Sequence, residues 1–312
     1  MFCLKISKTQ IKTLGELLGE PLALGIPLKR LTSYRIGGPA DAVAFPRNTK
    51  TLSSVLLFVK QEGIRHFLLG NGTNVLFDDE GFRGLIIAPI RMKQFSVDKD
   101  SSGAALLTAQ AGIPLSLVVW RACKLGLHGM EPLWGIPGSV GGSVACNAGS
   151  GGSSLGDIVS KLTVLDTNGK EIELEKGTFS YGYRFCDLPL KSVVLQASFQ
   201  LSPLNPDEIM KQLQHFRNTR RLSQPRGFPS CGCVFKNSSN GLAAGELIEK
   251  LGFKGVTEGG AQVSNVHANF IINRNMAKAR DVLALIEKIA EAAYNKAGIT
   301  FELEIKVVRS GE

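Results

Sequence analysis

Apolar residues recur at helical spacing in several separate stretches of the chain. The clearest stretch is 280–297, where Val282, Leu285, Ile286 and Ile289 share one face and Gly298 follows. Apolar residues three and four positions apart lie on the same side of an α-helix, and glycine commonly ends one. The pattern predicts helices over 8–19, 49–62, 115–125, 207–222, 245–251 and 280–297.

Shorter apolar runs predict strands between these helices. Phe301 to Val307 alternates apolar with charged residues, which is typical of a strand with one buried face. Asn168-Gly169 separates two apolar runs and predicts a β-hairpin. We expect strands over 42–46, 66–69, 85–90, 105–111, 159–165, 171–174, 191–201, 268–272 and 301–307.

The bulk composition narrows the class of protein. The chain has 312 residues, of which 44% are apolar and 20% charged, as in an ordinary globular protein. No apolar run approaches the roughly 20 residues that a membrane-spanning helix needs, and the first ten residues lack a signal-peptide pattern. The six cysteines form no paired CxxC motif, so we expect neither a metal site nor a disulfide framework. A cytoplasmic protein without membrane contact is the expectation.

The formal net charge of +9 raises the question of nucleic-acid binding. The basic residues are scattered, however, and the densest group is Arg217, Arg220 and Arg221. Such a small group suits one anionic small molecule better than a duplex.

Glycine is concentrated in the segment 135–152, which holds seven glycines in eighteen residues. Glycine costs about 0.5–1 kcal/mol relative to alanine inside regular structure, so a local excess indicates a linker or a place where bare backbone approaches a ligand. Ile136, Pro137 and Val140 favour a packed loop over a linker. A second glycine-rich loop, 70–74, follows a predicted strand. Both loops are therefore candidates for holding a phosphate or pyrophosphate through backbone N–H groups.

Taken together, the motifs resemble one known family. They are Tyr34-Arg35-Ile36-Gly37-Gly38, Gly70-Asn71-Gly72-Thr73-Asn74, the run from Gly135 to Gly142, Asn147-Ala148-Gly149, Gly182-Tyr183-Arg184, Gly232-Cys233-Val234-Phe235-Lys236-Asn237 and Glu302-Leu303-Glu304. In this order they are similar to the UDP-N-acetylenolpyruvoylglucosamine reductases, flavoenzymes of bacterial cell-wall synthesis. The similarity extends from about Leu31 to the C-terminus.

The resemblance implies an α+β fold. An FAD-binding domain of the vanillyl-alcohol-oxidase (PCMH) type would occupy 31–202, in lobes of about 31–95 and 96–202, after an N-terminal helical segment 1–30. Pro203 and Pro206 mark a boundary, so a substrate-binding domain would occupy 203–312, its last strand carrying a catalytic glutamate. The stretch from Arg184 to Cys233 leaves little room for the extra tyrosine-bearing loop of one subclass, which favours the shorter subclass.

The resemblance also implies two cofactors, FAD and NADPH, and no metal. NADPH would reduce FAD, and hydride would then pass from the flavin to C3 of the enolpyruvyl group of the sugar nucleotide. The residues implied in FAD binding are Arg35, Ile36, Gly37, Gly38, Gly70, Asn71, Gly72, Thr73, Asn74, Gly135, Ile136, Pro137, Gly138, Ser139, Gly141, Gly142, Asn147 and Gly149.

Three residues are implied in catalysis: Arg184, Cys233 and Glu304. Charge that develops on the substrate carboxylate needs a fixed cation, which suits Arg184. A neighbouring acid of raised pKa, Glu304, can share a proton with the enolate. Cys233 is a departure, because the family usually has serine there. A thiol, with a reference pKa of about 8.5, is the stronger acid and remains competent to donate the proton to C2.

Five further residues are candidates for binding the UDP-sugar: Arg221, Gln224, Lys236, Asn237 and His267. The expected partners are this sugar nucleotide and NADPH, with a monomeric enzyme that binds no nucleic acid.

Two alternatives remain open. One is another flavin oxidoreductase of the same fold, which would consume oxygen and ignore the enolpyruvyl sugar. The other is a basic nucleic-acid-binding protein without catalysis, which would be colourless and bind DNA in a salt-dependent manner.

Overall fold

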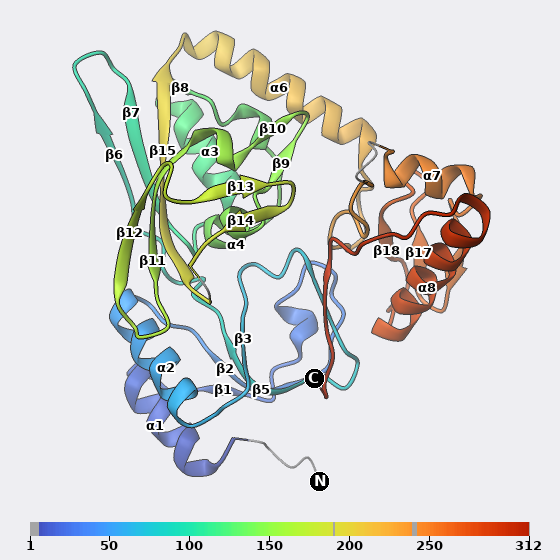
Figure 1. Ribbon diagram of the computed structural model, residues 1–312, viewed down its shortest axis with the longest axis horizontal. Coiled ribbons are helices and arrows are strands. Elements are labelled where there is room, and N and C mark those ends of the chain that lie inside the picture. The colour runs from blue at the N-terminus through green and yellow to red at the C-terminus, as the bar shows by residue number, and fades with distance from the viewer. Residues whose placement is uncertain (1–5, 190, 239–241, 312) are drawn as a thin grey trace. The chain divides into compact units, whose positions relative to one another are not determined.

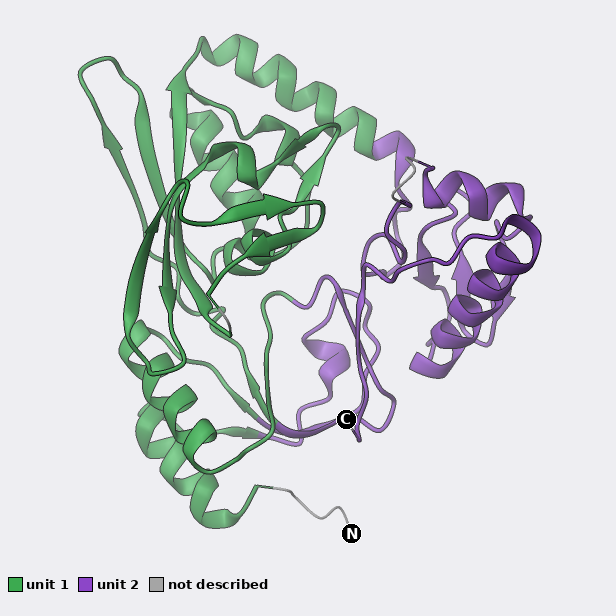
Figure 2. Cartoon of the chain, viewed as in Figure 1, with its two compact units in different colours: residues 1–23, 43–71, 85–220 green, residues 24–42, 72–84, 221–312 purple. Residues whose placement is uncertain are grey.

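The computed structural model describes residues 6–189, 191–238 and 242–311. These residues form two compact units (Figure 2). Unit 1 comprises 1–23, 43–71 and 85–220, and unit 2 comprises 24–42, 72–84 and 221–312. Each unit is therefore assembled from segments that are far apart in the sequence.

The main sheet of unit 1 is antiparallel, in the order β12-β11-β15-β7-β6, with β8 paired to β15 (Figure 1). In β7 buried residues alternate with half-buried ones, as expected for a strand with one face in the core. The predicted hairpin forms, and Asp166 accepts the backbone N–H groups of Asn168 and Lys170 in its turn. The strands are β6 (Phe95–Lys99), β7 (Ala105–Gln110), β8 (Leu127–His128), β11 (Val159–Leu165), β12 (Glu171–Glu175) and β15 (Val193–Pro203).

Helices and short turns complete unit 1. Ser7 caps α1 and Asn48 caps α2, each through its side-chain oxygen. The helical elements are α1 (Lys8–Leu18), α2 (Thr49–Gln61), α3 (Leu115–Lys124), η2 (Glu131–Leu133), α4 (Val140–Ala145), α5 (Leu155–Ile158) and α6 (Pro206–Ser223). Two small hairpins complete the set: β9 (Gly149–Ser150) with β10 (Ser153–Ser154), and β13 (Ser180–Gly182) with β14 (Phe185–Asp187).

A four-stranded sheet, in the order β1-β2-β5-β3, belongs in part to each unit. Its strands are β1 (Ala23–Leu24), β2 (Ala40–Ala44), β3 (His66–Leu68) and β5 (Phe82–Ile87). β3 pairs with β5 in parallel. The predicted succession of strand, helix and strand is thus present as β2, α2 and β3, with the glycine-rich loop 70–74 directly beyond.

Unit 2 is built on the long helix α8 (Ala279–Ala297). Val282, Leu285 and Ile289 on its predicted face are fully buried, and each such side chain stabilises the fold by about 1.5–3 kcal/mol. The other elements are η1 (Leu28–Arg30), β4 (Val75–Phe77), α7 (Ala244–Lys250), β16 (Thr257–Glu258), β17 (Ala261–Val263), β18 (Ile271–Asn273) and β19 (Lys306–Val308). The strands β16, β17 and β18 form one antiparallel sheet, and β19 pairs with β4 in parallel.

Two strand predictions in unit 2 were wrong in extent. The strand expected over 301–307 is only β19, because residues 301–305 form a single bridge, between Leu303 and Phe235. Glu304 therefore lies before the last strand rather than in it. The strand expected over 268–272 begins only at Ile271, because Phe270 closes a turn onto the carbonyl of His267.

The compact units differ from the domain bounds that the prolines suggested. Unit 1 extends to Arg220 instead of ending near residue 202, because Ile209 and Leu213 of α6 are buried in its core. Residues 24–42 and 72–84 belong to unit 2, where Tyr34, Ile36 and Leu76 enter the second core. No helix in the described ranges is long and apolar enough to cross a membrane.

Candidate functional site

Cys233 and Glu304 are brought together within unit 2 by main-chain pairing. Lys236 donates its backbone N–H to the carbonyl of Glu302 at 2.8 Å, and Glu304 donates its own to the carbonyl of Val234 at 2.8 Å. Asn74 donates its side-chain amide to the carbonyl of Glu304 at 3.0 Å, which fixes that residue from a third segment. Two of the three predicted catalytic residues are therefore held by adjacent, hydrogen-bonded backbone.

The surroundings of this pair are apolar. Burial raises the pKa of the Cys231 thiol, and the nearby charges of Cys233 and Glu304 raise it further. Burial also raises the pKa of Tyr34, with a smaller contribution from Cys231. The buried Tyr34 hydroxyl has no hydrogen-bond partner among the described residues. Cys231 and Tyr34 are thus neutral at physiological pH, in a buried environment of low dielectric.

Arg184 lies at the tip of the β13–β14 hairpin in unit 1. The hairpin register pairs Gly182 with Phe185, so Tyr183 and Arg184 form its two-residue loop. Arg184 has a φ of 58°, in the left-handed region that glycine or asparagine usually occupies. Its Nη1 donates to the carbonyl of Gly149 at 3.3 Å. Such backbone strain at a non-glycine residue is a recognised mark of functional sites.

Asn147 supports the same hairpin rather than pointing freely to a ligand. Its side-chain amide donates to the carbonyl of Gly182 at 2.9 Å, and its Oδ1 accepts the N–H of Gly156 at 3.0 Å. The residue is 8% exposed and has a φ of 42°. The contact of Asn147 with FAD stays a prediction. Its side chain fixes the loop that carries Arg184.

The glycine run 135–142 is a packed loop that leads into α4. Val140 and Gly141 donate to the carbonyls of Ile113 and Ala111, and Leu115 donates to the carbonyl of Gly138. A Cβ atom at Gly141 would lie 2.7 Å from the Cβ of Ala111, so this glycine is required by packing. The linker interpretation is therefore excluded.

The two glycine-rich loops meet in unit 1. A Cβ atom at Gly70 would lie 2.6 Å from the Oγ of Ser139, which itself caps α4. With the Ser139 side chain in its capping position only glycine fits at residue 70, and Gly138 beside it has a φ of 142°. The half-buried Gly70 and Gly138, with the buried Ser139 between the two loops, thus bring bare backbone together as a pyrophosphate site requires.

Two other residues of the second loop, Gly72 and Asn74, have structural roles within unit 2. A Cβ atom at Gly72 would lie 2.1 Å from the carbonyl oxygen of Leu31, so packing alone explains this glycine. Asn74, as noted, holds the backbone of Glu304. Contacts of Asn71, Gly72, Thr73 and Asn74 with FAD stay predictions.

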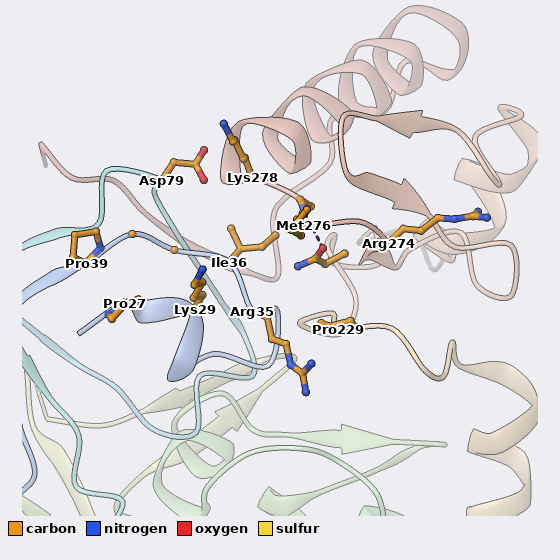
Figure 3. Close-up of a pocket in the computed structure, with 14 residues that line it drawn as sticks. Pro27, Lys29, Arg35, Ile36, Pro39, Asp79, Pro229, Arg274, Met276 and Lys278 are labelled. Atoms are coloured by element: carbon orange, nitrogen blue, oxygen red, sulfur yellow. Dashed lines mark hydrogen bonds between the residues drawn. The ribbon is translucent and has the colours of Figure 1, made fainter. Parts of the chain in front are cut away.

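Arg35, Ile36, Gly37 and Gly38 line a pocket of about 640 Å³ in unit 2 (Figure 3). Gly37 and Gly38 are again explained by packing, since a Cβ atom at Gly38 would lie 2.1 Å from the carbonyl oxygen of Asp79. The carboxylate of Asp79 accepts the N–H groups at the start of α8, those of Ala279 and Arg280. The basic residues of the pocket wall do not converge: Arg35 and Arg274 extend in different directions in Figure 3.

Three of the predicted substrate residues also make internal contacts. Lys236 forms an ion pair with Glu302 at 2.5 Å. The Oδ1 of Asn237 accepts the first N–H of α7, that of Ala244, at 3.1 Å. Burial and the charge of Lys254 lower the pKa of His267, while Glu249 opposes this, so the imidazole is neutral near pH 7. Its Nδ1 accepts the N–H of Asn269 at 3.2 Å, which leaves Nε2 as the donor.

The C-terminal end of α6 is basic, and one of its arginines, Arg220, was not among the predicted site residues. Arg221 is exposed and Gln224 half-buried, both in unit 2. Arg220, in unit 1, lies against the glycine run: a Cβ atom at Gly135 would lie 3.2 Å from its Cδ. The sequence showed the cluster of arginines but not which one faces the loop. No group of histidine, cysteine, aspartate and glutamate side chains suited to a metal ion occurs among the described residues.

Comparison with known proteins covers nearly the whole chain. Residues 40–175 match the model of an FAD-binding domain family, and 224–308 match that of the UDP-N-acetylenolpyruvoylglucosamine reductase C-terminal domain. UDP-N-acetylenolpyruvoylglucosamine reductases of Carboxydothermus hydrogenoformans and Clostridioides difficile are each 36% identical. The alignments cover 97% and 96% of this chain and 99% and 97% of theirs.

A solved structure supports the same family. The crystal structure of UDP-N-acetylenolpyruvylglucosamine reductase (MurB) from Thermus caldophilus matches with a TM-score of 0.76 and 30% identity, over 92% of this chain and 99% of that one. The fold is accordingly α+β, with an FAD-binding domain of the PCMH type and a C-terminal domain. The chain belongs to the family of UDP-N-acetylenolpyruvoylglucosamine reductases.

Proposed function

We propose that this protein is an FAD-dependent enzyme that uses NADPH to reduce the enolpyruvyl ether of UDP-N-acetylglucosamine to UDP-N-acetylmuramate, a step of peptidoglycan precursor synthesis. One observation carries the proposal. Within the region that matches the reductase C-terminal domain, backbone pairing holds the thiol-bearing residue Cys233 next to Glu304. The reaction needs this combination of a proton donor and a second acid.

FAD, when bound, supplies the hydride that reaches C3 of the enolpyruvyl group. Gly70, Gly138 and Ser139 would hold its pyrophosphate through the backbone. The other residues that the family motifs assign to FAD, from Arg35 to Gly38 and from Asn71 to Asn74, are proposed contacts as well.

Arg184 would bind the substrate carboxylate. A guanidinium is permanently charged and planar, so it stabilises negative charge that develops there after hydride addition. The strained hairpin loop and the Asn147 contacts support this role, because they fix the backbone that carries the guanidinium.

Cys233 would donate the proton that C2 requires. Its S–H bond breaks, a C–H bond forms at C2, and the thiolate is reprotonated from solvent. Glu304 would share its proton with the carboxylate oxygen of the enolate and so reduce the charge that accumulates there. Lys236, Asn237, Arg221, Gln224 and His267 would bind the nucleotide and sugar, His267 as a neutral donor.

We further propose that the enzyme is a monomer of the cytoplasm, where NADPH and nucleotide-activated sugars are available. Between Arg184 and Cys233 the structure describes β14, β15 and α6, which account for most of that stretch. This supports the shorter subclass of the family, without the tyrosine-bearing loop.

The visible spectrum of the purified protein tests the function. We expect a flavin band that NADPH bleaches under anaerobic conditions and that the enolpyruvyl sugar nucleotide restores. Oxygen consumption without a response to this substrate would instead indicate another flavin oxidoreductase. A colourless protein that binds no added FAD would exclude both.

The variant Cys233→Ala tests the role of the thiol. NADPH should still bleach the flavin, because this half-reaction needs no proton at C2. Product should form at least about 100-fold more slowly, the range typical of losing a general acid. Full turnover by this variant would refute the role of Cys233.

A further inference from the structure

A second cysteine, Cys231, lies two residues before the proposed proton donor, on a segment that is anchored at both ends. On one side, Ser33 donates its hydroxyl to the carbonyl of Ser230 at 2.7 Å. On the other side, Val234 donates its N–H to the carbonyl of Asn269 at 2.9 Å. The sequence Cys231-Gly232-Cys233 forms the bend between these anchors, and both thiols are reduced in the structure.

The geometry of this bend permits a bond between the two sulfur atoms. Residues that flank a single residue have their Cα atoms at most about 7 Å apart, and a bend brings them closer. Disulfides join Cα atoms about 4.4–6.8 Å apart. Gly232 has a φ of 87°, and a Cβ atom there would meet nothing within 4 Å. The side of Gly232 that a Cβ atom would occupy is therefore open, and glycine has the widest choice of backbone angles.

The two thiols differ in accessibility. Cys233 is half-buried, so a small oxidant reaches it. Cys231 is 3% exposed and packs in the core of unit 2. Burial raises the pKa of Cys231, so this residue stays a thiol at physiological pH while Cys233 meets the oxidant first.

We propose that Cys231 and Cys233 form a reversible disulfide that switches the enzyme off under oxidative conditions and protects Cys233 from irreversible oxidation. The loss of activity in this proposal rests on the proposed role of Cys233, because a sulfur atom in a disulfide has no proton to donate. The bond itself does not depend on that role.

The chemistry needs one oxidant, hydrogen peroxide. Peroxide transfers an oxygen atom to the sulfur of Cys233, which gives a sulfenic acid and one water molecule. The sulfur of Cys231 then attacks that of Cys233. An S–S bond forms, the S–O bond breaks, and the hydroxyl leaves as water with the proton of Cys231. A dithiol reductant reverses the change by thiol–disulfide exchange.

The small size of the disulfide ring affects how stable the bond is, and the pKa of Cys231 affects how fast it forms. A disulfide across one residue is strained and hence readily reduced, as regulatory disulfides are. The second step becomes faster as the pH rises, because the thiolate of Cys231 is the attacking form, and the raised pKa of Cys231 keeps this step slow near pH 7.

The test treats the FAD-loaded enzyme with hydrogen peroxide and then with dithiothreitol. Trypsin should release both cysteines on one peptide, Gly227–Lys236, which holds no other cysteine. We expect this peptide to lose two hydrogen atoms in mass, together with at least about tenfold lower activity, and to regain both on reduction. Faster formation of the bond at higher pH is also expected.

Two variants and a control sharpen the result. Cys231→Ala should lose activity to peroxide irreversibly, its peptide gaining two or three oxygen atoms at Cys233. Cys233→Ser should resist peroxide. Cys146→Ser, which removes a half-buried thiol of unit 1, should behave as the parent enzyme does.

Equal recovery of the parent enzyme and Cys231→Ala after reduction would overturn the proposal, as would a peptide that never loses two hydrogen atoms. These outcomes are distinct from failure of the proposed function. If Cys233 is not the proton donor, the disulfide still forms in the peptide but leaves turnover unchanged.

Discussion

At residue 233 the chain carries a sulfur atom, where the family resemblance leads us to expect a hydroxyl. The backbone on its C-terminal side is fixed by the carbonyl and side chain of Asn269, which hold Val234 and Phe235. Glu304 is fixed in turn by Val234 and Asn74. Because the main chain sets the position of this side chain, replacing the sulfur of Cys233 with oxygen changes the acidity of the group more than its position.

The variant Cys233→Ser tests this separation of place and acidity. A serine fits the space of a cysteine and can donate a proton, although its hydroxyl is a much weaker acid than a thiol. We expect activity within about tenfold of the parent enzyme, a modest part of the full effect of a general acid. Steady-state turnover with the enolpyruvyl sugar measures it. A loss as large as that of Cys233→Ala would show that the thiol itself is required.

At the scale of elements, the start of α8 depends on two carboxylates. Asp281 accepts the N–H groups of Lys278 and Gly260, both at 3.0 Å. Burial by itself would raise the pKa of Asp281. These two hydrogen bonds and the charges of Arg280 and Lys278 outweigh it, so the net pKa is lowered. Asp79 binds the next two N–H groups of the helix.

Replacement of this carboxylate, Asp281→Asn, should destabilise the protein by about 0.3–1 kcal/mol near pH 7, because the amide oxygen still accepts hydrogen bonds but the negative charge at the helix N-terminus is lost. A lowered folded pKa means that the stabilisation is fully present above the unfolded pKa of about 3.9 and is lost as the pH falls through the folded value. The difference between parent and variant should therefore shrink below about pH 4. Thermal unfolding at several pH values measures it, and a constant difference would contradict the assignment.

The meeting of two loops at Gly70 and Ser139 gives a second test at this scale. In Gly70→Ala the new methyl group would overlap the Oγ of Ser139, so this side chain must rotate and give up its cap on α4, or one of the two loops must shift. We expect weaker FAD binding, by about tenfold or more, measured by flavin fluorescence. Gly15→Ala in α1 is a matched control, since its Cβ would lie 3.5 Å from the nearest atom. Unchanged affinity in Gly70→Ala would remove this loop from the cofactor site.

At the scale of the whole molecule, two cores rather than one stabilise the chain. Along the sequence, the match to the first family model, 40–175, ends before α6, and the match to the second, 224–308, begins directly after it. The bounds of the two compact units differ from those of the family models. Residues 24–42 and 72–84 belong to unit 2, because they contribute Tyr34, Ile36 and Leu76 to the second core. Prolines at 203 and 206 mark the start of a helix whose buried residues still belong to the first core.

Removal of FAD should lower the thermal stability of the whole protein. A ligand at 100 times its dissociation constant stabilises the native state by about 2.7 kcal/mol, which corresponds to about 5–10 °C in melting temperature. Calorimetry of the apoprotein with and without added FAD measures the shift. The same concentration of AMP serves as control, and an equal shift with AMP would indicate that the flavin part contributes nothing.

The sequence by itself determined most of the local structure. Six predicted helices occur within a few residues of their expected bounds, because apolar periodicity and caps are local signals. The hairpin at Asn168-Gly169 formed for the same reason. The ordered motifs were enough to indicate the family, since each is a short run of residues readable without a structure.

Tertiary structure decided what each glycine and polar residue does. Gly38, Gly72 and Gly141 were assigned to a cofactor, yet each is also required where two segments of the chain pack together. Asn147 was assigned to the cofactor, and its side chain also holds the hairpin of Arg184. The bridge between Phe235 and Leu303, which brings Cys233 beside Glu304, joins residues far apart in the sequence. Such contacts arise from packing in three dimensions, and no periodicity along the chain encodes them.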